Sequence, residues 1–349
     1  MKRKNKILLV FGFPVGEHWL YKELKTKFPD REVEVVKNKK RVYDSRKSKL
    51  NVFKSAGTIT GQCLRALFSS CRNDVIVCWS QNFAVILYLL SRLFFKKRRI
   101  VSLHWLSPTS SGIRRRLEKF FASSKNNFVV VNSKGNDIVW KNHLSLKNAD
   151  NFFYVPDSCG YVEFENYKPK SERYCFSGGM NNRDWALLSE VAGRLPEIEF
   201  VCVALEKDFA SQVENPPKNM MVYFQTAEKK YYELMQNSYL TLLPLKTHNA
   251  SGLINLIKSA QFCLPCVATK TPATDVYFEN KSLLIDGADK EAWIKTIENI
   301  FAMNESEHRS LSENYSDYIK KEFSPERTIE TILKIIIQSD KTKTGKDRK

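Results

Sequence analysis

Residues 243–260 have the residue types of an anion-binding loop in front of a helix. An apolar strand-like run ends there, a small polar loop follows, and an apolar-periodic helix begins near Ser251. The unpaired N–H groups at a helix start attract anions, and Gly252 leaves room for a phosphate group to approach. We predict that Lys246, Asn249, Ser251 and Gly252 contact a diphosphate, with Ser251 capping the helix.

Two further loops of the second half have suitable chemistry. The run Ser-Gly-Gly that ends at Gly179 is followed by Arg183, between a predicted strand and a predicted helix. The fixed fork of arginine donors matches the oxygens of a diphosphate. A polar loop that contains Thr274 follows the next strand along. Since ligands bind outside the carboxyl ends of parallel strands, we expect Gly179, Arg183 and Thr274 at one ligand site.

The first half offers a glycine pair and a histidine at strand ends. Gly12 and Gly16 lie in the loop after the first predicted strand, where backbone N–H groups can approach a phosphate or a sugar. His104 ends the fourth predicted strand, and an imidazole there can bond a sugar hydroxyl and shift a proton near neutral pH. A plain turn and a core histidine are the alternatives for these features.

The elements that position these residues alternate between short apolar runs and helical patterns, which is typical of βαβ units and mostly parallel sheets. The predicted strands are 7–11, 32–37, 75–79, 99–104, 128–132, 152–155, 174–177, 199–204, 220–224, 238–243, 266–269 and 282–285. The predicted helices are 18–27, 58–70, 83–95, 113–123, 135–142, 184–194, 229–236, 252–262, 290–303, 307–323 and 325–339. The pattern predicts an α/β protein with two successive sheets, joined by a linker at 163–172.

We predict an exposed loop at 37–54 and a disordered basic tail at 340–349. The chain of 349 residues has a formal charge of +18, which residues 1–165 carry with 31 basic and 13 acidic side chains. Residues 166–349 are neutral by the same count, with 25 of each. The 43% hydrophobic content excludes a wholly disordered chain. Because neither a signal peptide nor a bilayer-length apolar run is visible, we expect a cytoplasmic protein.

Basic clusters at 96–99 and 114–116 stand beside apolar residues of the first half, which include residues 93–95 and Leu117, Phe120 and Phe121. This mixture is characteristic of a helix that lies on an anionic membrane surface. We therefore expect a peripheral location on the inner face of the cell membrane, with a solvated basic surface as the alternative.

In its order of elements the chain resembles the two-domain glycosyltransferases of the GT-B fold, in particular the retaining group 1, or family 4-like, enzymes. The resemblance is most specific from Tyr174 to Gly287, where Phe176-Ser-Gly-Gly179, Arg183, Asn249-Ala-Ser-Gly252 and Cys263-Leu-Pro-Cys-Val267 match family patterns. It implies two Rossmann-like domains with a cleft between them, an acceptor domain at 1–165, a donor domain at 166–324 and a C-terminal helix, 325–339, that returns to the first domain.

The resemblance implies an enzyme that transfers a sugar from a nucleotide diphosphate sugar to a saccharide or lipid-linked saccharide, in surface polysaccharide synthesis. It places Arg183, Ser251 and Gly252 on the donor diphosphate, the Gly12–Gly16 loop facing the substrates and His104 beside the transferred sugar. It implies no cofactor and no metal. Lys258 stands where the family usually has a ribose-binding glutamate, and it can contact a phosphate or ribose oxygen as a donor.

Three other functions stay open at this stage. Lys258 would suit a catalytically inactive partner subunit of a glycosyltransferase. A nucleotide-sugar epimerase can share the double fold, but it needs more acidic groups and histidines than these loops hold. The basic charge would permit nucleic-acid binding, but since no nucleic-acid-binding module is visible we expect no nucleic-acid partner.

Overall fold

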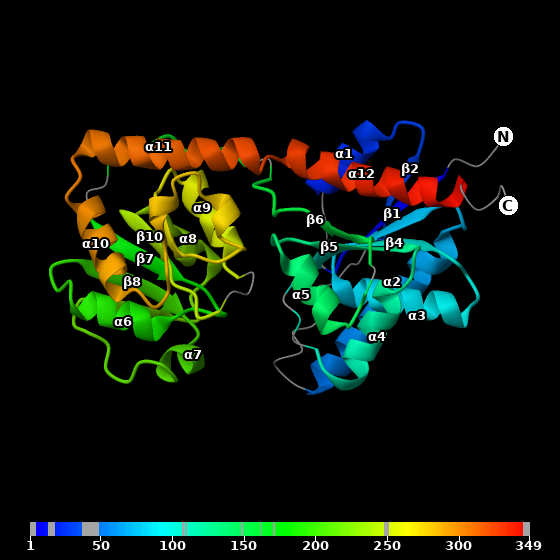
Figure 1. Cartoon of the computed structure of the whole chain (residues 1–349), viewed down its shortest axis with the longest axis horizontal. Coiled ribbons are helices and arrows are strands. Elements are labelled where there is room, and N and C mark those ends of the chain that lie inside the picture. The colour runs from blue at the N-terminus through cyan, green and yellow to red at the C-terminus, as the bar shows by residue number, and fades with distance from the viewer. Residues whose placement is uncertain are drawn as a thin grey trace. The chain divides into compact units, whose positions relative to one another are not determined.

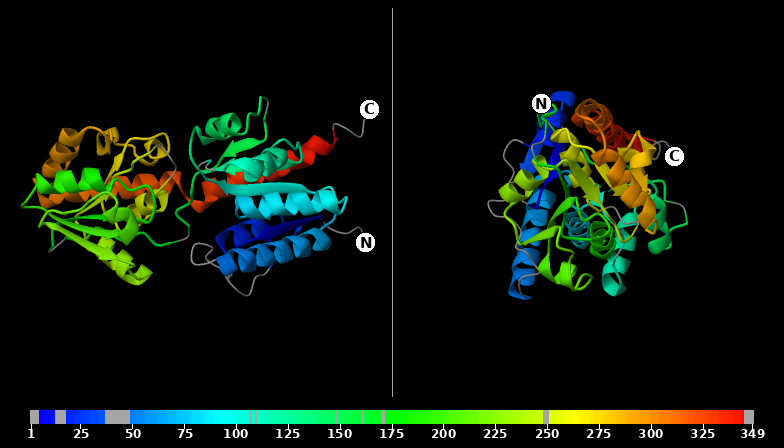
Figure 2. Two further views of the ribbon diagram at one scale, coloured as in Figure 1. Left: turned by 90° about the horizontal axis from the view of Figure 1, so that it is seen from below. Right: turned by 90° about the vertical axis from the view of Figure 1, so that its left-hand side faces the viewer.

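The computed structural model describes residues 5–12, 18–36, 49–106, 108, 110–147, 149–160, 162–169, 172–247 and 251–344. The chain forms two compact α/β units, each built on a six-stranded sheet (Figures 1 and 2). Unit 1 comprises Met1–Pro156 and Pro325–Lys349, and unit 2 comprises Asp157–Ser324. The predicted fold class, two Rossmann-like domains with a C-terminal helix that returns to the first, is confirmed.

The sheet of unit 1 is parallel, with strand order β2-β1-β3-β4-β5-β6. Its strands are β1 Lys6–Val10, β2 Glu32–Val36, β3 Val75–Cys78, β4 Arg99–Trp105, β5 Asn127–Val131 and β6 Phe152–Tyr154. The central strands are continuous apolar runs, and β3 is buried along its whole length. Such runs form strands here because helices cover both faces of the sheet.

Two layers of helices enclose this sheet. They are α1 Trp19–Lys27, α2 Lys49–Ser69, α3 Gln81–Leu93, α4 Gly112–Ala122, α5 Asn136–His143 and α12 Pro325–Thr344. One core cluster contains buried side chains of α2, α3, α4 and α5. A second cluster contains those of α1 and α12, so the C-terminal helix completes the other face of the unit 1 sheet.

Unit 2 repeats the plan with strand order β12-β11-β10-β7-β8-β9, again parallel. Its strands are β7 Tyr174–Gly178, β8 Glu199–Ala204, β9 Met220–Phe224, β10 Leu240–Leu243, β11 Cys266–Thr269 and β12 Leu284–Ile285. Its α-helices are α6 Trp185–Gly193, α7 Glu206–Ala210, α8 Glu228–Gln236, α9 Leu253–Gln261, α10 Lys290–Phe301 and α11 Glu305–Glu322. Short 3-10 turns, η1 Asp275–Tyr277 and η2 Lys281–Leu283, lie between β11 and β12.

The division between the units lies before residue 157, whereas the sequence suggested 165. Residues 157–165 belong to unit 2 because their backbone bonds to it: the Cys159 N–H donates to the Phe323 carbonyl at 2.9 Å and the Glu165 N–H to Gln261 at 2.8 Å. With α12 counted in unit 1, that unit holds 38 basic and 14 acidic residues, a net charge of +24. Unit 2 then has a net charge of −6, so it is acidic rather than neutral.

Three element predictions need correction. Helix α2 begins at Lys49, so the end of the segment expected as a loop at 37–54 is helical, while residues 37–48 lie outside the described part. Helix α12 continues to Thr344, so residues 340–344 of the expected disordered tail are helical. Residues 345–349 are not described. The short helix α7 has no counterpart among the predicted elements. Of the helices described, none has the length and apolarity to span a membrane.

Candidate functional site

The order of strands in unit 2 places its topological switch point between β7 and β10. The chain runs from β7 outward through β8 and β9, then returns to add β10, β11 and β12 on the other side. In open α/β sheets a ligand binds at this switch point, outside the carboxyl ends of the strands. The described segments there are residues 179–184 after β7, and residues 244–247 and 251–252 after β10.

Hydrogen bonds hold these two segments together. Arg183 and Leu245 form an isolated antiparallel β-bridge. Further bonds join the Asp184 N–H to the Pro244 carbonyl at 3.1 Å, the Lys246 N–H to the Asn182 carbonyl at 3.2 Å, and the Ser251 hydroxyl to the Asn181 carbonyl at 3.2 Å. The structure thus brings together four of the predicted donor-site residues, namely Gly179, Arg183, Ser251 and Gly252, and fixes the backbone of Lys246 beside them.

Arg183 is the buried cation of this site, with 2% of its surface exposed. Its Nε donates to the Gly178 carbonyl at 2.9 Å and its Nη1 to the Asn181 carbonyl at 3.1 Å. Nη2 has no hydrogen-bond partner, and no carboxylate pairs with the guanidinium, within the described part of the chain. Burial lowers the pKa of Arg183 from its ordinary value, but an arginine still stays charged. A buried charge without a counterion favours an anionic ligand.

Two glycines make room for this guanidinium. A β-carbon on Gly179 would collide with Nη2, and one on Gly252 would lie 2.7 Å from Nη2 and 2.6 Å from Leu243 Cδ1. Both glycines have positive φ, 148° and 76°, which other residues adopt only with strain. The sequence therefore places glycine here for backbone conformation and for space at once.

Gly252, not Ser251, is the N-cap of α9, and it offers no side-chain hydrogen bond. The prediction that Ser251 caps the helix is wrong, because its hydroxyl donates to the Asn181 carbonyl instead. Helix α9 therefore begins without a side-chain cap, next to the guanidinium of Arg183. A helix N-terminus and an arginine together can bind the oxygens of a diphosphate.

Asn255 and Tyr231 form a hydrogen-bonded pair next to the end of β7, which the sequence did not predict. The Asn255 side-chain amide donates to the Gly178 carbonyl at 2.8 Å and to the Tyr231 hydroxyl at 2.7 Å. Burial raises the pKa of Tyr231 to about 12, although the nearby Arg183 acts in the opposite direction. Asn255 therefore links α9 to the end of β7 and to α8. The only signal for it in the sequence is its place one turn into the predicted helix.

Three other predicted donor residues have different settings. Lys258 places its ammonium group 5.5 Å from the centre of the Tyr232 ring, and burial lowers its pKa. Thr274 is fully buried, and its hydroxyl donates to the Thr269 carbonyl at 2.7 Å and accepts from the Thr271 N–H at 2.9 Å, so it holds the loop together rather than facing a ligand. Asn249 lies outside the described residues.

Unit 1 carries an aromatic cluster at the corresponding edge of its own sheet. The switch point lies between β1 and β3. Phe11 follows β1, Trp79 follows β3, and the rings of His18 and His104 lie 4.8 Å and 4.4 Å from the Trp79 ring. Gly12 follows Phe11, while Gly16 is not among the described residues.

His104 sits in a break of strand β4. Its φ is 53°, and the pairing of β4 with β5 shifts register between Ser102 and Trp105. Bulges of this kind re-aim a side chain and are common next to active sites. The Trp105 indole N–H donates to the Ser102 hydroxyl at 2.6 Å across the break, which fixes the distortion in place.

His18, which the sequence analysis did not single out, is the N-cap of α1. Its Nδ1 accepts the Leu20 N–H at 3.2 Å, so the proton of the neutral ring is on Nε2. Burial, with a smaller contribution from His104, lowers the pKa of His18 to about 4. His18 is therefore a neutral hydrogen-bonding group at neutral pH. Its position after the Gly12–Gly16 loop was the available signal.

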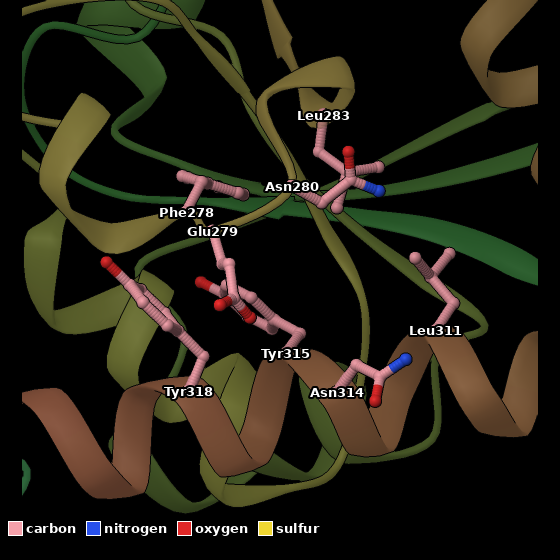
Figure 3. A pocket seen from close by; sticks show the side chains of 8 residues that line it. All are labelled: Phe278, Glu279, Asn280, Leu283, Leu311, Asn314, Tyr315 and Tyr318. Atoms are coloured by element: carbon pink, nitrogen blue, oxygen red, sulfur yellow. The ribbon is translucent and has the colours of Figure 1, made fainter.

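Unit 2 also has a pocket of about 340 Å³ between residues 278–283 and helix α11 (Figure 3). The rings of Phe278, Tyr315 and Tyr318 line it. The Tyr315 and Tyr318 hydroxyls donate to backbone carbonyls, so these side chains also fasten α11 to the unit. It shares no residue with the loops around Arg183. Within the described ranges, no group of three or more His, Cys, Asp or Glu side chains could hold a metal ion.

The sequence matches no protein-family model and no curated protein. Its structure is similar to that of a glycosyltransferase from Rickettsia africae (TM-score 0.66, 12% identity), covering 96% of this chain and 98% of that one. It is also similar to Anabaena Alr3699/HepE in complex with UDP (TM-score 0.67, 13% identity, 95% and 100% covered). An E. coli protein bound with UDP-2-fluoro glucose gives a TM-score of 0.66 at 10% identity, with 96% and 99% covered. The chain therefore has the two-domain GT-B fold that these structures share.

Proposed function

We propose that the protein is a glycosyltransferase that moves a sugar from a nucleotide diphosphate sugar to a saccharide or lipid-linked saccharide. One observation carries the proposal: Arg183 is a buried guanidinium without an ion pair in the described chain, at the switch point and beside the uncapped start of α9. The Anabaena HepE structures, which have the same fold, hold UDP and UDP-glucose. That likeness supports a uridine nucleotide as the first donor to test.

In the proposed reaction the bond between the sugar C1 and the diphosphate oxygen breaks, and its electron pair leaves with the diphosphate. The oxygen of an acceptor hydroxyl forms the new bond to C1, and the hydroxyl proton passes to the leaving diphosphate or to solvent. Arg183 and the first N–H groups of α9 stabilise the negative charge where it develops. Lys246, exposed on the same loop, adds a third positive group. The chemistry of these groups suits a metal-independent reaction, and we propose retention at C1 on the resemblance to the group 1 enzymes.

The acceptor is proposed to bind unit 1 at the aromatic cluster. Aromatic faces pack against the C–H face of a sugar, and imidazole rings hydrogen-bond sugar hydroxyls. His104, turned by the break in β4, is the proposed contact to the transferred sugar. We further propose a place in surface polysaccharide synthesis, in the cytoplasm at the inner face of the cell membrane.

Titration calorimetry with UDP, and a transfer or hydrolysis assay with a panel of UDP-sugars, test this proposal. Arg183→Ala should weaken UDP binding by at least about tenfold, since a hydrogen bond to a charged group contributes about 1.5–3 kcal/mol. Arg194→Ala is the matched control, because Arg194 is exposed on the same unit and pairs with Glu291. A parent protein that binds no nucleotide, or an Arg183→Ala protein that binds UDP normally, would contradict the proposal.

One observation supports an alternative function, a catalytically inactive partner subunit of a glycosyltransferase. Lys258 occupies the place where the family has a carboxylate, and its ammonium packs over Tyr232. This alternative predicts UDP binding without turnover of any donor in the panel. Turnover by the purified chain alone would exclude it.

A further inference from the structure

The carboxyl ends of helices α2, α3 and α4 carry exposed apolar side chains on unit 1. Phe95 is 95% exposed, Leu93 68% and Phe68 58%, and Phe94 and Phe120 are also exposed. The Phe68 and Phe94 rings contact each other with centres 5.4 Å apart, which joins the end of α2 to the end of α3. We call Phe68, Leu93, Phe94 and Phe95 the aromatic tip.

The backbone presents Phe95 to solvent rather than folding it inward. It follows the end of α3 with a φ of 54°, the left-handed conformation of a helix C-terminal motif, in which the Phe95 N–H donates to the Arg92 carbonyl at 3.2 Å and the Lys96 N–H to the Ser91 carbonyl at 2.7 Å. Glycine is the usual residue at this position, and a phenylalanine there that is 95% exposed gains nothing from burial, so a binding role explains its side chain better.

Basic residues accompany the aromatic tip, and one of them contacts it. Lys96 places its ammonium 5.2 Å from the centre of the Phe68 ring, and Arg72, Arg92 and Lys97 are exposed nearby in the sequence. Between Asp44 and Glu118 the chain has fourteen basic residues and one acidic residue, Asp74. Asp74 is 1% exposed and accepts two backbone N–H groups, so its carboxylate does not offset the surface charge.

The structure also corrects which basic residues are available. Arg98 and Arg99, which the sequence placed in a membrane-facing cluster, are each 8% exposed. Arg98 donates to Ser70 and the Leu67 carbonyl, and Arg99 to the Asn73 carbonyl. Phe121 is fully buried as well. At the tip itself the accessible positive charge therefore lies on residues 92, 96 and 97, and the second predicted cluster, Arg114 to Arg116, is exposed on α4.

We propose that the aromatic tip inserts into the interface of an anionic lipid bilayer. Phenylalanine and leucine side chains enter the acyl boundary, while lysines and arginines remain with the phosphate groups. Charge complementarity selects this partner, because the tip belongs to the unit with a net charge of +24. The inference adds a surface and a lipid class to the proposed function, and it does not depend on donor binding.

The position of the tip restricts the acceptor. The helix ends precede the amino ends of β3 and β4, whereas Trp79 follows the carboxyl end of β3 and His104 lies at the carboxyl end of β4. β3 has four residues and β4 has seven, so at about 3.3 Å per residue these edges lie about 13–23 Å apart. An acceptor saccharide that extends from the membrane surface can reach the aromatic cluster. An acceptor hydroxyl at the level of the lipid headgroups cannot. This corollary rests on the proposed acceptor site.

Flotation of the full chain with vesicles tests the proposal. We expect binding to phosphatidylglycerol-containing vesicles, weakened by salt, and none to pure phosphatidylcholine vesicles. Phe95→Ser should lower the partition coefficient by about tenfold, and Lys96→Gln with Lys97→Gln by about as much. The matched controls are Ile138→Ser, an exposed apolar residue of α5, and Lys207→Gln with Lys218→Gln on unit 2; both should bind like the parent.

A Phe95→Trp variant measures insertion directly. Its emission, after subtraction of the parent spectrum, should shift to the blue with anionic vesicles and be quenched by brominated lipid. Absence of vesicle binding at low salt, or a Phe95→Ser protein that binds like the parent, overturns the proposal. A dimer that Phe95→Ser dissociates, without vesicle binding, would assign the tip to a second copy of the chain instead.

UDP titrations on the same preparations separate the two proposals. Phe95→Ser should bind UDP normally, and Arg183→Ala should float normally. If the parent protein binds vesicles but does not bind UDP, the proposed donor site is contradicted and the proposed lipid-binding surface is not.

Discussion

The guanidinium of Arg183 lies so close to Gly252 that a β-carbon on the glycine would come within 2.7 Å of Nη2. This contact ties the start of helix α9 to the loop after β7. Gly252 also has a φ of 76°. This position therefore needs glycine for two reasons: the left-handed backbone conformation, and the lack of space for a β-carbon.

Gly252→Ala should be more destabilising than its counterpart at another helix start. Gly135, the N-cap of α5, has a φ of 78° and open space where a β-carbon would stand. Gly135→Ala should cost about 1 kcal/mol for the left-handed backbone, and Gly252→Ala about 2 kcal/mol more for overpacking. Urea unfolding measures both, and UDP titration should show weaker binding only for Gly252→Ala. Equal costs would show that Arg183 can move aside.

His104→Asn should separate catalysis from folding. Asparagine tolerates positive φ, so the free energy of unfolding should stay within about 1 kcal/mol of the parent. The transfer rate should fall by about a hundredfold if the imidazole acts at the sugar. His143→Asn, outside the aromatic cluster, serves as the control and should keep its rate. A fully active His104→Asn enzyme would remove this residue from the site.

Lowering the pH should destabilise unit 1 through His18. Its folded pKa of about 4 lies below the ordinary value of 6.5, so the unfolded chain takes up a proton first as the pH falls. The stability from the neutral ring is complete above about pH 6.5 and is lost as the pH falls through about 4.

His18→Asn keeps an N-cap acceptor and does not titrate. The stability advantage of the parent over this variant should shrink by about 1–2 kcal/mol from neutral pH to pH 4, a value reduced for partial exposure of the ring. Urea unfolding across this range, with NMR titration of the imidazole, measures it. An imidazole pKa near 6.5 in the folded protein would contradict the prediction.

Lys258→Met tests whether this lysine contacts the donor. The ammonium lies over the Tyr232 ring, and methionine keeps the apolar stem. We expect UDP affinity within about twofold of the parent and a loss of stability below about 1 kcal/mol, the size of an exposed cation–π contact. A tenfold or greater loss of UDP affinity would place Lys258 at the nucleotide.

Local sequence patterns predicted most strands and helices because their signals are local. The apolar runs that became β3 and β10 are bounded by polar residues, and parallel strands covered on both faces have this form. The start of α2 was missed because lysines and serines hide its periodicity, and α7 because it has five residues. Neither is a failure of the fold-level pattern.

The site was predictable to the level of loops. Carboxyl ends of neighbouring parallel strands meet at one edge, so the segments with Arg183 and Gly252 had to be close. The role of Ser251 was not predictable, because capping and a bond to the Asn181 carbonyl both suit a serine at that position. The inward direction of Arg98 and Arg99 depends on the packing of α2, which spacing along the chain does not encode.

The sequence by itself determined the alternation of elements, the two-unit plan and the identities of the phosphate-suited loops, because periodicity and glycine placement act over short distances. Only the tertiary structure decided that Arg183 is buried between two glycines without an ion pair in the described chain, and that Phe95 projects into solvent among lysines. Burial and charge pairing are sums over residues distant in sequence, so they exist only once the chain has folded.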